Sequence, residues 1–187
     1  MCSSDLTTAD TKLKINTFLI WRKGEVDDFE LRFQYRFQSE KGNSGVQYRS
    51  WQEPESVGKW SIGGYQADFE AGTNYSGILY GERFRGILAK RGEQTVIEAN
   101  HKPKLVNKFA ESADLQKVVK QNDWNSYRVV AQGFHFIHEL NGHKTIEVTD
   151  EDTEKRRDRG LLALQVHVGP PMKVQFRNIE LKQLKGN

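Results

Sequence analysis

Polar and ionisable side chains recur at every second position in three short segments of the sequence. Alternation of this kind places them together on one face of a β-strand and leaves apolar residues on the other face. Segment by segment they are Gln47, Arg49 and Trp51 in 43–51, Gln66, Asp68 and Glu70 in 64–70, and Gln165 and His167 in 161–168. If these strands are neighbours, their polar faces form one floor of amide, carboxylate, guanidinium and imidazole groups. Such a floor is typical of a sugar site, because vicinal hydroxyls need paired polar partners and the C–H side of a sugar needs an aromatic ring.

A solvent-exposed strand face is the competing interpretation, and it explains any one of these segments equally well. The third segment favours a site, because Gln165 and His167 are unusual choices on a strand that is otherwise aliphatic. Arg83 and Arg85 lie close by in sequence, in a loop flanked by glycines. We therefore treat the polar positions of these segments as one candidate site.

Other chemistry finds little support in the sequence. It contains no Walker-type loop, no GxSxG elbow and no HExxH motif. His135 and His138 are three residues apart on a predicted strand, so they point to opposite faces and cannot chelate a metal as a pair. The charged run 150–159 is expected to be an exposed loop, with a Ca²⁺ site as the lesser alternative because the run holds several acids.

The composition sets further bounds. The chain has 187 residues, of which 28 are Lys or Arg and 25 are Asp or Glu, so the net charge of +3 is too even for a nucleic-acid surface. No apolar run is long enough to span a membrane, and the first ten residues do not predict a secretory leader. The single cysteine, Cys2, excludes an internal disulfide. The 20 aromatic residues can supply a large core.

The elements that must position the candidate site are strands. Residues 28–38 alternate without a fault, with Phe29 to Phe37 on the buried face. The other strands are predicted at 12–21, 45–51, 64–70, 76–80, 126–132, 134–140, 143–148, 161–168 and 173–183. Asn141-Gly142 marks a hairpin, and a shift of apolar phase at Asn178 indicates a bulge. Only 104–120 breaks the pattern, and there we predict a crossover loop with a little helix. This pattern indicates an all-β sandwich of two antiparallel sheets.

Several motifs occur in the order found in one known family. They are Asn-Ser-Gly-Val-Gln-Tyr-Arg-Ser at 43–50, Gly-Gly-Tyr-Gln-Ala-Asp at 63–68, Gly-Ile-Leu-Tyr at 77–80, Arg-Gly-Ile-Leu at 85–88, Trp-Asn-Ser-Tyr at 124–127, Leu-Asn-Gly at 140–142, Leu-Gln-Val-His-Val-Gly at 164–169 and Val-Gln-Phe-Arg-Asn-Ile at 174–179. From about Phe29 to the C-terminus the chain resembles the 3-keto-disaccharide (3-keto-glycoside) hydrolases. The resemblance implies a concanavalin- or lectin-like jelly roll, a small carbohydrate as partner, and a periplasmic or secreted bacterial protein. We expect one domain over 1–187, shortened at its N-terminus relative to the family.

The resemblance also implies a reaction on a sugar already oxidised at C3. The ketone acidifies the hydrogen on C2, a base removes it, the group on C1 leaves by elimination, and water then adds. His167 is the first candidate for base or acid, because the pKa of an imidazole lies near neutrality. Asp68 is the alternative base, or it orients the histidine.

Substrate binding is assigned to the neighbouring polar residues. The candidates are Arg49 and Arg85 for the enolate or the ring, Gln66 and Gln165 for hydroxyls, Tyr48 or Tyr80 for stacking or hydrogen bonding, and Glu70 on the same predicted face. A divalent metal is an open question, with His167, Asp68 and Glu70 as the conceivable ligands. A glycan-binding module without catalysis is the alternative function, since a fold does not dictate its chemistry.

Overall fold

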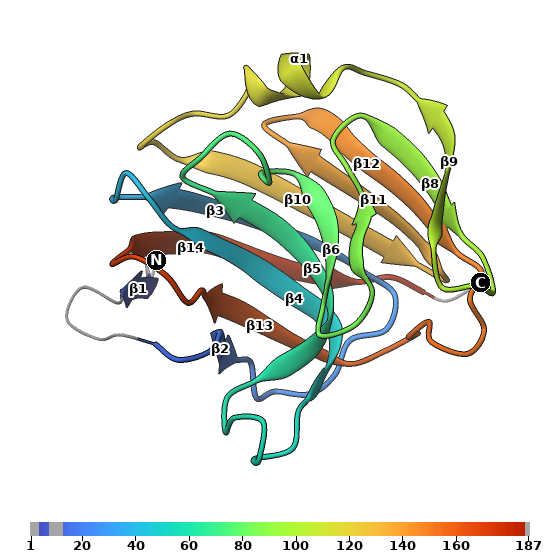
Figure 1. Cartoon of the computed structure of the whole chain (residues 1–187), viewed down its shortest axis with the longest axis horizontal. Helices are drawn as coiled ribbons and strands as arrows, with labels where there is room; N and C mark the ends of the chain where they lie inside the picture. Colours follow the sequence, from blue (N-terminus) through green and yellow to red (C-terminus); the bar gives the residue numbers. More distant parts are fainter. Residues whose placement is uncertain (1–3, 8–12, 186–187) are drawn as a thin grey trace.

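Two β-sheets stacked face to face make up the molecule, in a computed structural model that describes residues 4–7 and 13–185 (Figure 1). One sheet has the strand order β1-β14-β3-β10-β11-β12-β8-β9 and the other β2-β13-β4-β5-β6-β7. The elements are β1 Ser4–Thr7, β2 Thr17–Ile20, β3 Phe29–Phe37, β4 Asn43–Gln52, β5 Ile62–Glu70, β6 Ile78–Glu82, β7 Gly86–Ala89, β8 Glu93–Ile97, β9 Pro103–Lys108, α1 Ser112–Gln116, β10 Asn125–Gln132, β11 His135–Leu140, β12 His143–Asp150, β13 Leu161–Val166 and β14 Lys173–Gln183. The all-β sandwich is confirmed.

The core between the sheets follows from the alternation in β3. Phe29, Leu31, Phe33, Tyr35 and Phe37 are all buried, and the residues between them reach the other side of the sheet. Their rings meet aromatic rings from both sheets, including a stacked Tyr35–Phe69 pair with centroids 3.9 Å apart. The predicted buried face of 28–38 is therefore confirmed.

Two local predictions about the backbone are also confirmed. Asn141 and Gly142 both have positive φ, at 50° and 83°, as a tight hairpin between β11 and β12 requires. Asn178 has φ 51°, and the pairing of β14 with β3 shifts between Arg177 and Glu180. This irregularity is the bulge that the shift of apolar phase predicts.

The stretch between β6 and β10 was predicted incompletely. A short helix does lie within 104–120, but the start of that range is strand β9, and β7 and β8 precede it. All six residues of β9 are exposed, so this edge strand needs no apolar alternation and is hard to recognise. In addition, β8 pairs with β12 in parallel, so the sheets are not purely antiparallel.

The predicted strand 12–21 is shorter in the structure. Only Thr17–Ile20 pairs as β2, because Asn16 turns its side chain to Glu82 and to the backbone of Val168. Lys12 and Cys2 lie outside the described residues. Among the residues that are described, no helix has the length and apolarity needed to cross a bilayer.

Candidate functional site

The site is built on the face of the six-stranded sheet that turns away from the core. In β5, Tyr65, Ala67 and Phe69 enter the core, so Gln66 and Asp68 project from the opposite face. Figure 1 shows β13, β4, β5 and β6 crossing in front of the other sheet, and they are hydrogen-bonded neighbours in that order. The expectation that the three polar segments lie side by side is therefore confirmed.

A cavity of about 430 Å³ opens on this face, and we call it the polar cavity. Its lining residues are Asn16, Asn43, Gln66, Asp68, Tyr75, Ile78, Tyr80, Glu82, Ile87, Gln165 and His167. Five of the nine residues proposed from the sequence are among them. The volume is within the range of small-molecule sites.

Side-chain amides link the carboxyl groups of the polar cavity. Gln47 donates to the side-chain oxygen of Gln66 at 2.7 Å, and the Gln66 amide nitrogen lies 3.2 Å from Asp68 Oδ2 and 3.3 Å from Gln165 Oε1. Gln165 in turn reaches Glu82 Oε2 at 3.5 Å. The direction of each donor is thus set by its neighbour, which holds the cavity floor in one arrangement.

A glycine makes this arrangement possible. A Cβ atom at Gly45 would lie 2.6 Å from Cγ and Cδ of Gln66, closer than real atoms approach. The space beside Gly45 is filled by the Gln66 side chain.

The carboxyl groups of Asp68 and Glu82 are both buried, and burial raises the pKa of each. Burial raises the pKa of Asp68 to about 8, against hydrogen bonds from Asn43 and Gln66 that favour the ionised form. Burial also raises the pKa of Glu82, although Asn16 donates to its oxygens at 3.1 and 3.3 Å. At neutral pH Asp68 is therefore mostly protonated and can act as a proton donor.

His167 faces the same cavity with one ring nitrogen already used. Its Nδ1 lies within hydrogen-bond distance of the Val168 carbonyl oxygen, which can only accept. In the tautomer whose Nδ1–H donates to this carbonyl, the imidazole presents the lone pair of Nε2. That is the form of imidazole that removes a proton from a substrate.

Tyr80 supplies a hydroxyl to the cavity. Burial raises its pKa, and the nearby carboxyl groups of Glu82 and Asp68 raise it further. The Tyr80 hydroxyl therefore remains protonated at neutral pH and can donate a hydrogen bond to a substrate oxygen.

Arg49 does not reach this site, contrary to the prediction. The pairing of β4 with β5 shifts between Tyr48 and Trp51, and Arg49 has φ 46°, so strict alternation fails there. The Arg49 side chain is completely buried and binds the Asp27 carbonyl at 2.8 Å and the Asp28 carboxylate at 2.9 Å. Its role is structural, at the end of the sandwich.

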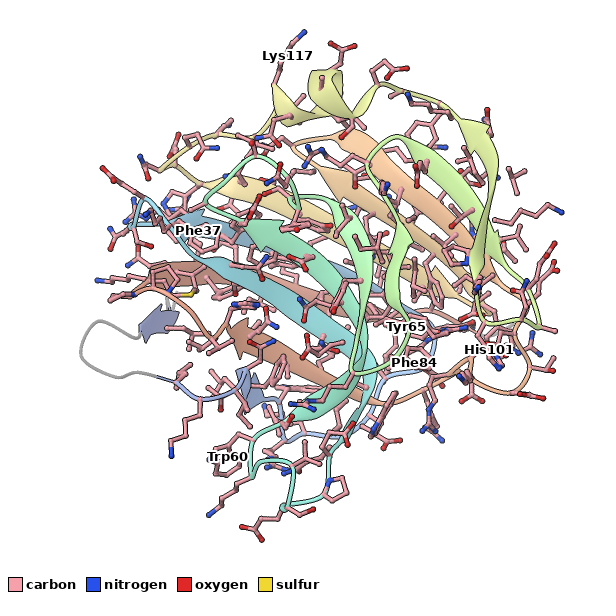
Figure 2. All side chains as sticks on the ribbon, viewed as in Figure 1. Phe37, Trp60, Tyr65, Phe84, His101 and Lys117 are labelled. Carbon is pink, nitrogen blue, oxygen red and sulfur yellow. The ribbon has the colours of Figure 1, made fainter. Side chains whose placement is uncertain are left out.

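Arg85 does not reach the polar cavity either, and the charged run 150–159 is mostly an exposed loop, as predicted, although Asp150 and Asp152 are buried. Arg85 pairs with Asp150 and, at 3.0 Å, with Asp152, and both carboxylates are fully buried rather than exposed. Asp150 also accepts from the hydroxyl of Tyr65, whose ring packs edge-on against Phe84 at 5.4 Å between centroids (Figure 2). Two buried carboxylates that already neutralise an arginine are not available as a Ca²⁺ site.

Two other predicted residues lie elsewhere. Tyr48 is a core residue that hydrogen-bonds His138 at 3.0 Å, because it occupies the inward position of β4. The Glu70 carboxylate accepts from the backbone N–H groups of Asn74 and Tyr75. Within the described part of the chain no three His, Cys, Asp or Glu side chains are placed to hold a metal, so His167, Asp68 and Glu70 do not form the conceivable ligand set.

Sequence reasoning missed several lining residues. Glu82 was not assigned to the site because the predicted strand 76–80 ended two residues before the observed end of β6. Tyr80 and Glu82 lie on one face of β6, as Gln66 and Asp68 do on β5. Asn43 is the first residue of the polar segment 43–51, but it was not assigned to the site. Asn16 gave no signal, since it meets Glu82 from 66 residues away in the chain.

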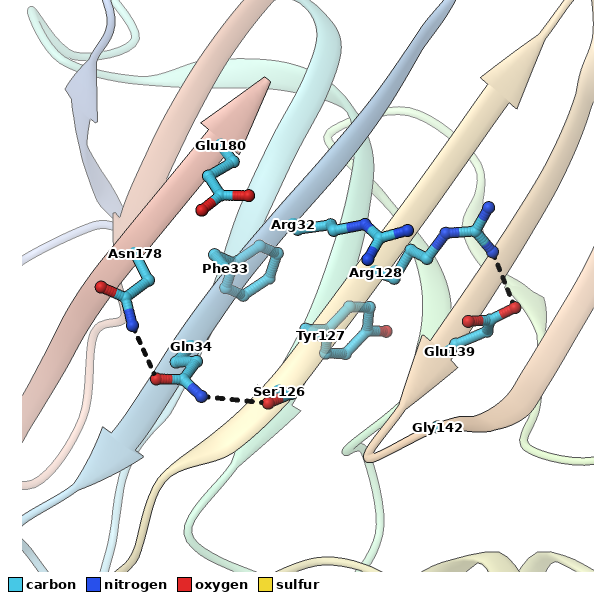
Figure 3. A pocket seen from close by; sticks show the side chains of 10 residues that line it. All are labelled: Arg32, Phe33, Gln34, Ser126, Tyr127, Arg128, Glu139, Gly142, Asn178 and Glu180. Carbon is cyan, nitrogen blue, oxygen red and sulfur yellow. Dashed lines mark hydrogen bonds and ion pairs between the residues drawn. The ribbon is translucent and has the colours of Figure 1, made fainter. Parts of the chain in front are cut away.

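A second hollow, of about 310 Å³, lies on the outer face of the other sheet (Figure 3). Arg128, which lines it, binds Glu139 at 2.8 Å and also binds Glu30 at 2.7 Å. Gln34 similarly donates to Ser126 and accepts from Asn178. Because these side chains already bind protein partners, this surface offers less for catalysis than the polar cavity.

Comparison with known proteins identifies the family and agrees with the fold. A family model described as a 3-keto-alpha-glucoside-1,2-lyase-like domain matches residues 5–182. The chain belongs to this family. The match begins well before Phe29, where the sequence resemblance was first apparent, and it includes β1 and β2. Membership ties the protein to a carbohydrate-related function.

Solved structures with low sequence identity share the sandwich architecture of this family member. The carbohydrate-binding module CBM66 from Bacillus subtilis has a TM-score of 0.58 at 13% identity, over 96% of this chain and 95% of that chain. A candidate glycosyl hydrolase from Parabacteroides distasonis has a TM-score of 0.60 at 20% identity, over 98% and 81%. A Bacillus subtilis protein of unknown function with a galectin-like fold has a TM-score of 0.55 at 8% identity, over 99% and 90%. No curated protein sequence matches the chain. These likenesses show the jelly-roll fold alone.

Proposed function

We propose that the protein cleaves 3-keto-glycosides by elimination at C1 followed by hydration. The observation that carries this proposal is the convergence of His167 and the buried, protonated Asp68 on one cavity of sugar size. Elimination next to a ketone needs a base for the C2 hydrogen and an acid for the leaving oxygen. The family to which the chain belongs supports the choice of a keto sugar as substrate.

The roles follow from the protonation states. Nε2 of His167 removes the hydrogen from C2, and the electron pair of that bond forms an enolate with the C3 ketone. The enolate expels the oxygen on C1, which takes the proton of Asp68 and leaves an enone. Water then adds to C1 and returns a proton to Asp68, while the imidazolium returns its proton to C2. One water is consumed and both residues regain their starting states.

Neutral donors, rather than arginines, must stabilise the enolate in this arrangement. The Tyr80 hydroxyl and the side-chain amide of Asn43 line the polar cavity and can donate to sugar oxygens. Because the cavity floor is fixed by hydrogen bonds, these donors need little reorganisation during the reaction. The amides of Gln66 and Gln165 also suit vicinal hydroxyls.

The test is release of the leaving group from a 3-keto-glucoside, with the unoxidised glucoside as control. We expect cleavage of the keto form only, and incorporation of deuterium at C2 of the product when the reaction runs in D₂O. His167→Ala and Asp68→Asn should each lower kcat by about 10²-fold or more, while substrate binding changes far less.

Other outcomes identify other functions. Equal cleavage of both glucosides would indicate ordinary glycosidase chemistry, which uses two carboxyl groups and no ketone. Binding of the keto sugar without release, unaffected by His167→Ala, would indicate a glycan-binding module instead.

We also propose that residues 1–187 act as one domain in the periplasm or outside the cell, by analogy with the family. Fractionation of cells that express the complete gene tests this location, and recovery in the cytoplasmic fraction alone would contradict it.

A further inference from the structure

A second, smaller cavity of about 280 Å³ adjoins the polar cavity, and we call it the side cavity. It is lined by Gly42, Asn43, Glu70, Tyr75, His167, Val168, Pro170 and Met172. Asn43, Tyr75 and His167 line both cavities, so the catalytic imidazole stands at their boundary. A substrate reacting at His167 would therefore extend into both spaces.

The two cavities differ in chemistry. Apart from the shared residues, the polar cavity presents amide, carboxyl and hydroxyl groups together with the apolar Ile78 and Ile87, whereas the side cavity presents Gly42, Glu70, Val168, Pro170 and Met172. Its carboxylate, Glu70, accepts hydrogen bonds from the backbone of Asn74 and Tyr75, at 2.5 and 3.0 Å from one oxygen. Hydroxyl groups placed against the apolar side chains would lose their water partners without replacement.

Tyr75 forms the wall between the cavities and is held by an ordered loop. The guanidinium of Arg91, whose residue is only 4% exposed, donates to the carbonyls of Thr73 and Ser76 at 2.8 Å each. Glu70 binds the same loop from the other side through the backbone N–H of Tyr75. The Tyr75 residue is 44% exposed, so a ring available for stacking is presented from a backbone that is already fixed.

We propose that the side cavity binds an apolar, cyclic or aromatic leaving group, while the keto sugar occupies the polar cavity. This inference rests on the proposed function, and it makes a second sugar the poorer leaving group. The C1–O bond would cross the boundary beside His167. The ring of the leaving group would stack on Tyr75 and contact Pro170 and Val168.

The experiment compares methyl and cyclohexylmethyl 3-keto-glucosides of one anomer, whose leaving oxygens have similar basicity. We expect kcat/KM to be about 10-fold higher for the cyclohexylmethyl compound, because burial of its ring adds favourable contact area. A 3-keto-disaccharide of the same anomer should fall below the cyclohexylmethyl compound.

Adjacent prolines provide a matched pair of variants. Pro170 and Pro171 are both exposed, but only Pro170 lines the side cavity. Pro170→Asp should lower the ratio of the two kcat/KM values by about 5-fold or more, since it places a charge beside the apolar ring. Pro171→Asp should leave the ratio unchanged, and circular dichroism checks that both variants fold.

The outcomes separate this inference from the function on which it rests. Cleavage of the methyl compound without preference for the larger ring, or an equal response to both proline variants, overturns the apolar subsite alone. A 3-keto-disaccharide that outperforms the cyclohexylmethyl compound does the same. Release from none of the keto-glycosides contradicts the proposed function and the subsite together.

Discussion

The raised pKa of Asp68 affects the stability of the folded protein. Burial raises the pKa of this residue to about 8 in the folded protein, from the ordinary aspartate value of 3.8. Between these two pH values the folded protein binds a proton that the unfolded chain has released, so stability falls as pH rises toward 8. A buried carboxyl group that stays protonated therefore costs folding free energy at neutral pH.

Replacement of Asp68 tests how its ionisation affects the free energy of unfolding. Asp68→Asn keeps the shape but cannot ionise, so it should raise the free energy of unfolding at about pH 8.5 by a few kcal/mol (~2–4) and much less at about pH 4. Urea unfolding at the two pH values measures this, and the exposed Asp123→Asn serves as the control. A variant less stable than wild type at the higher pH would contradict the raised pKa.

The pH dependence of the reaction should report the same group. As acid, Asp68 must hold its proton, so kcat/KM should decline above about pH 8, as its carboxyl group ionises. The measurement is kcat/KM between about pH 6 and pH 10 on the keto-glycoside. An activity that continues to rise through pH 9 would exclude Asp68 as the acid.

At the scale of elements, the site depends on how closely β4 and β5 approach each other. Gly45 and Asp68 are register partners on these strands, and the missing side chain of Gly45 gives Gln66 its place. The same pair of strands contains the shift after Tyr48 that turns Arg49 out of the site. Strand pairing therefore decides which polar residues enter the polar cavity.

Gly45→Ala tests this dependence. The added methyl group must displace the Gln66 side chain, so we expect kcat/KM to fall about 10-fold or more, with a change in the free energy of unfolding of about 1–2 kcal/mol. The double variant Gly45→Ala/Gln66→Ala should be no less active than Gln66→Ala alone. Independent, additive losses would show that Gly45 acts by another route.

At the scale of the molecule, one buried histidine connects the two sheets. His138 lies between the hydroxyl of Tyr48 from the six-stranded sheet, at 3.0 Å, and that of Tyr127 from the eight-stranded sheet, at 3.1 Å. Burial lowers its pKa to about 3. Below pH 6.5 the unfolded chain gains a proton that the folded protein excludes, so stability falls with decreasing pH until about pH 3.

The acid sensitivity of the fold should therefore depend on this residue. Between about pH 5.5 and 3.5, His138 contributes a loss of about 1.4 kcal/mol per pH unit, and His138→Gln should remove that part of the slope. The variant should also lose about 1–3 kcal/mol at neutral pH, because glutamine satisfies the two hydroxyls less well. Urea unfolding across this pH range measures both effects. His135→Gln, on the outer face of the same strand, serves as the control variant.

The sequence alone determined the features that depend on neighbouring residues. Alternation in 28–38 established the buried face of β3, Asn141-Gly142 established a hairpin, and the polar faces of 64–70 and 161–168 identified the cavity residues Gln66, Asp68, Gln165 and His167. These predictions succeed because the direction of a side chain on a regular strand is set by its position in that strand.

Only the tertiary structure decided which distant groups meet. Asn16 joins Glu82 across 66 residues, Arg85 leaves the cavity for two buried aspartates, and an irregular pairing turns Arg49 toward Asp28. A buried charged group is stable only when the packed chain places an oppositely charged group close to it. That choice depends on the register and bulges of paired strands, which no local pattern of residues specifies.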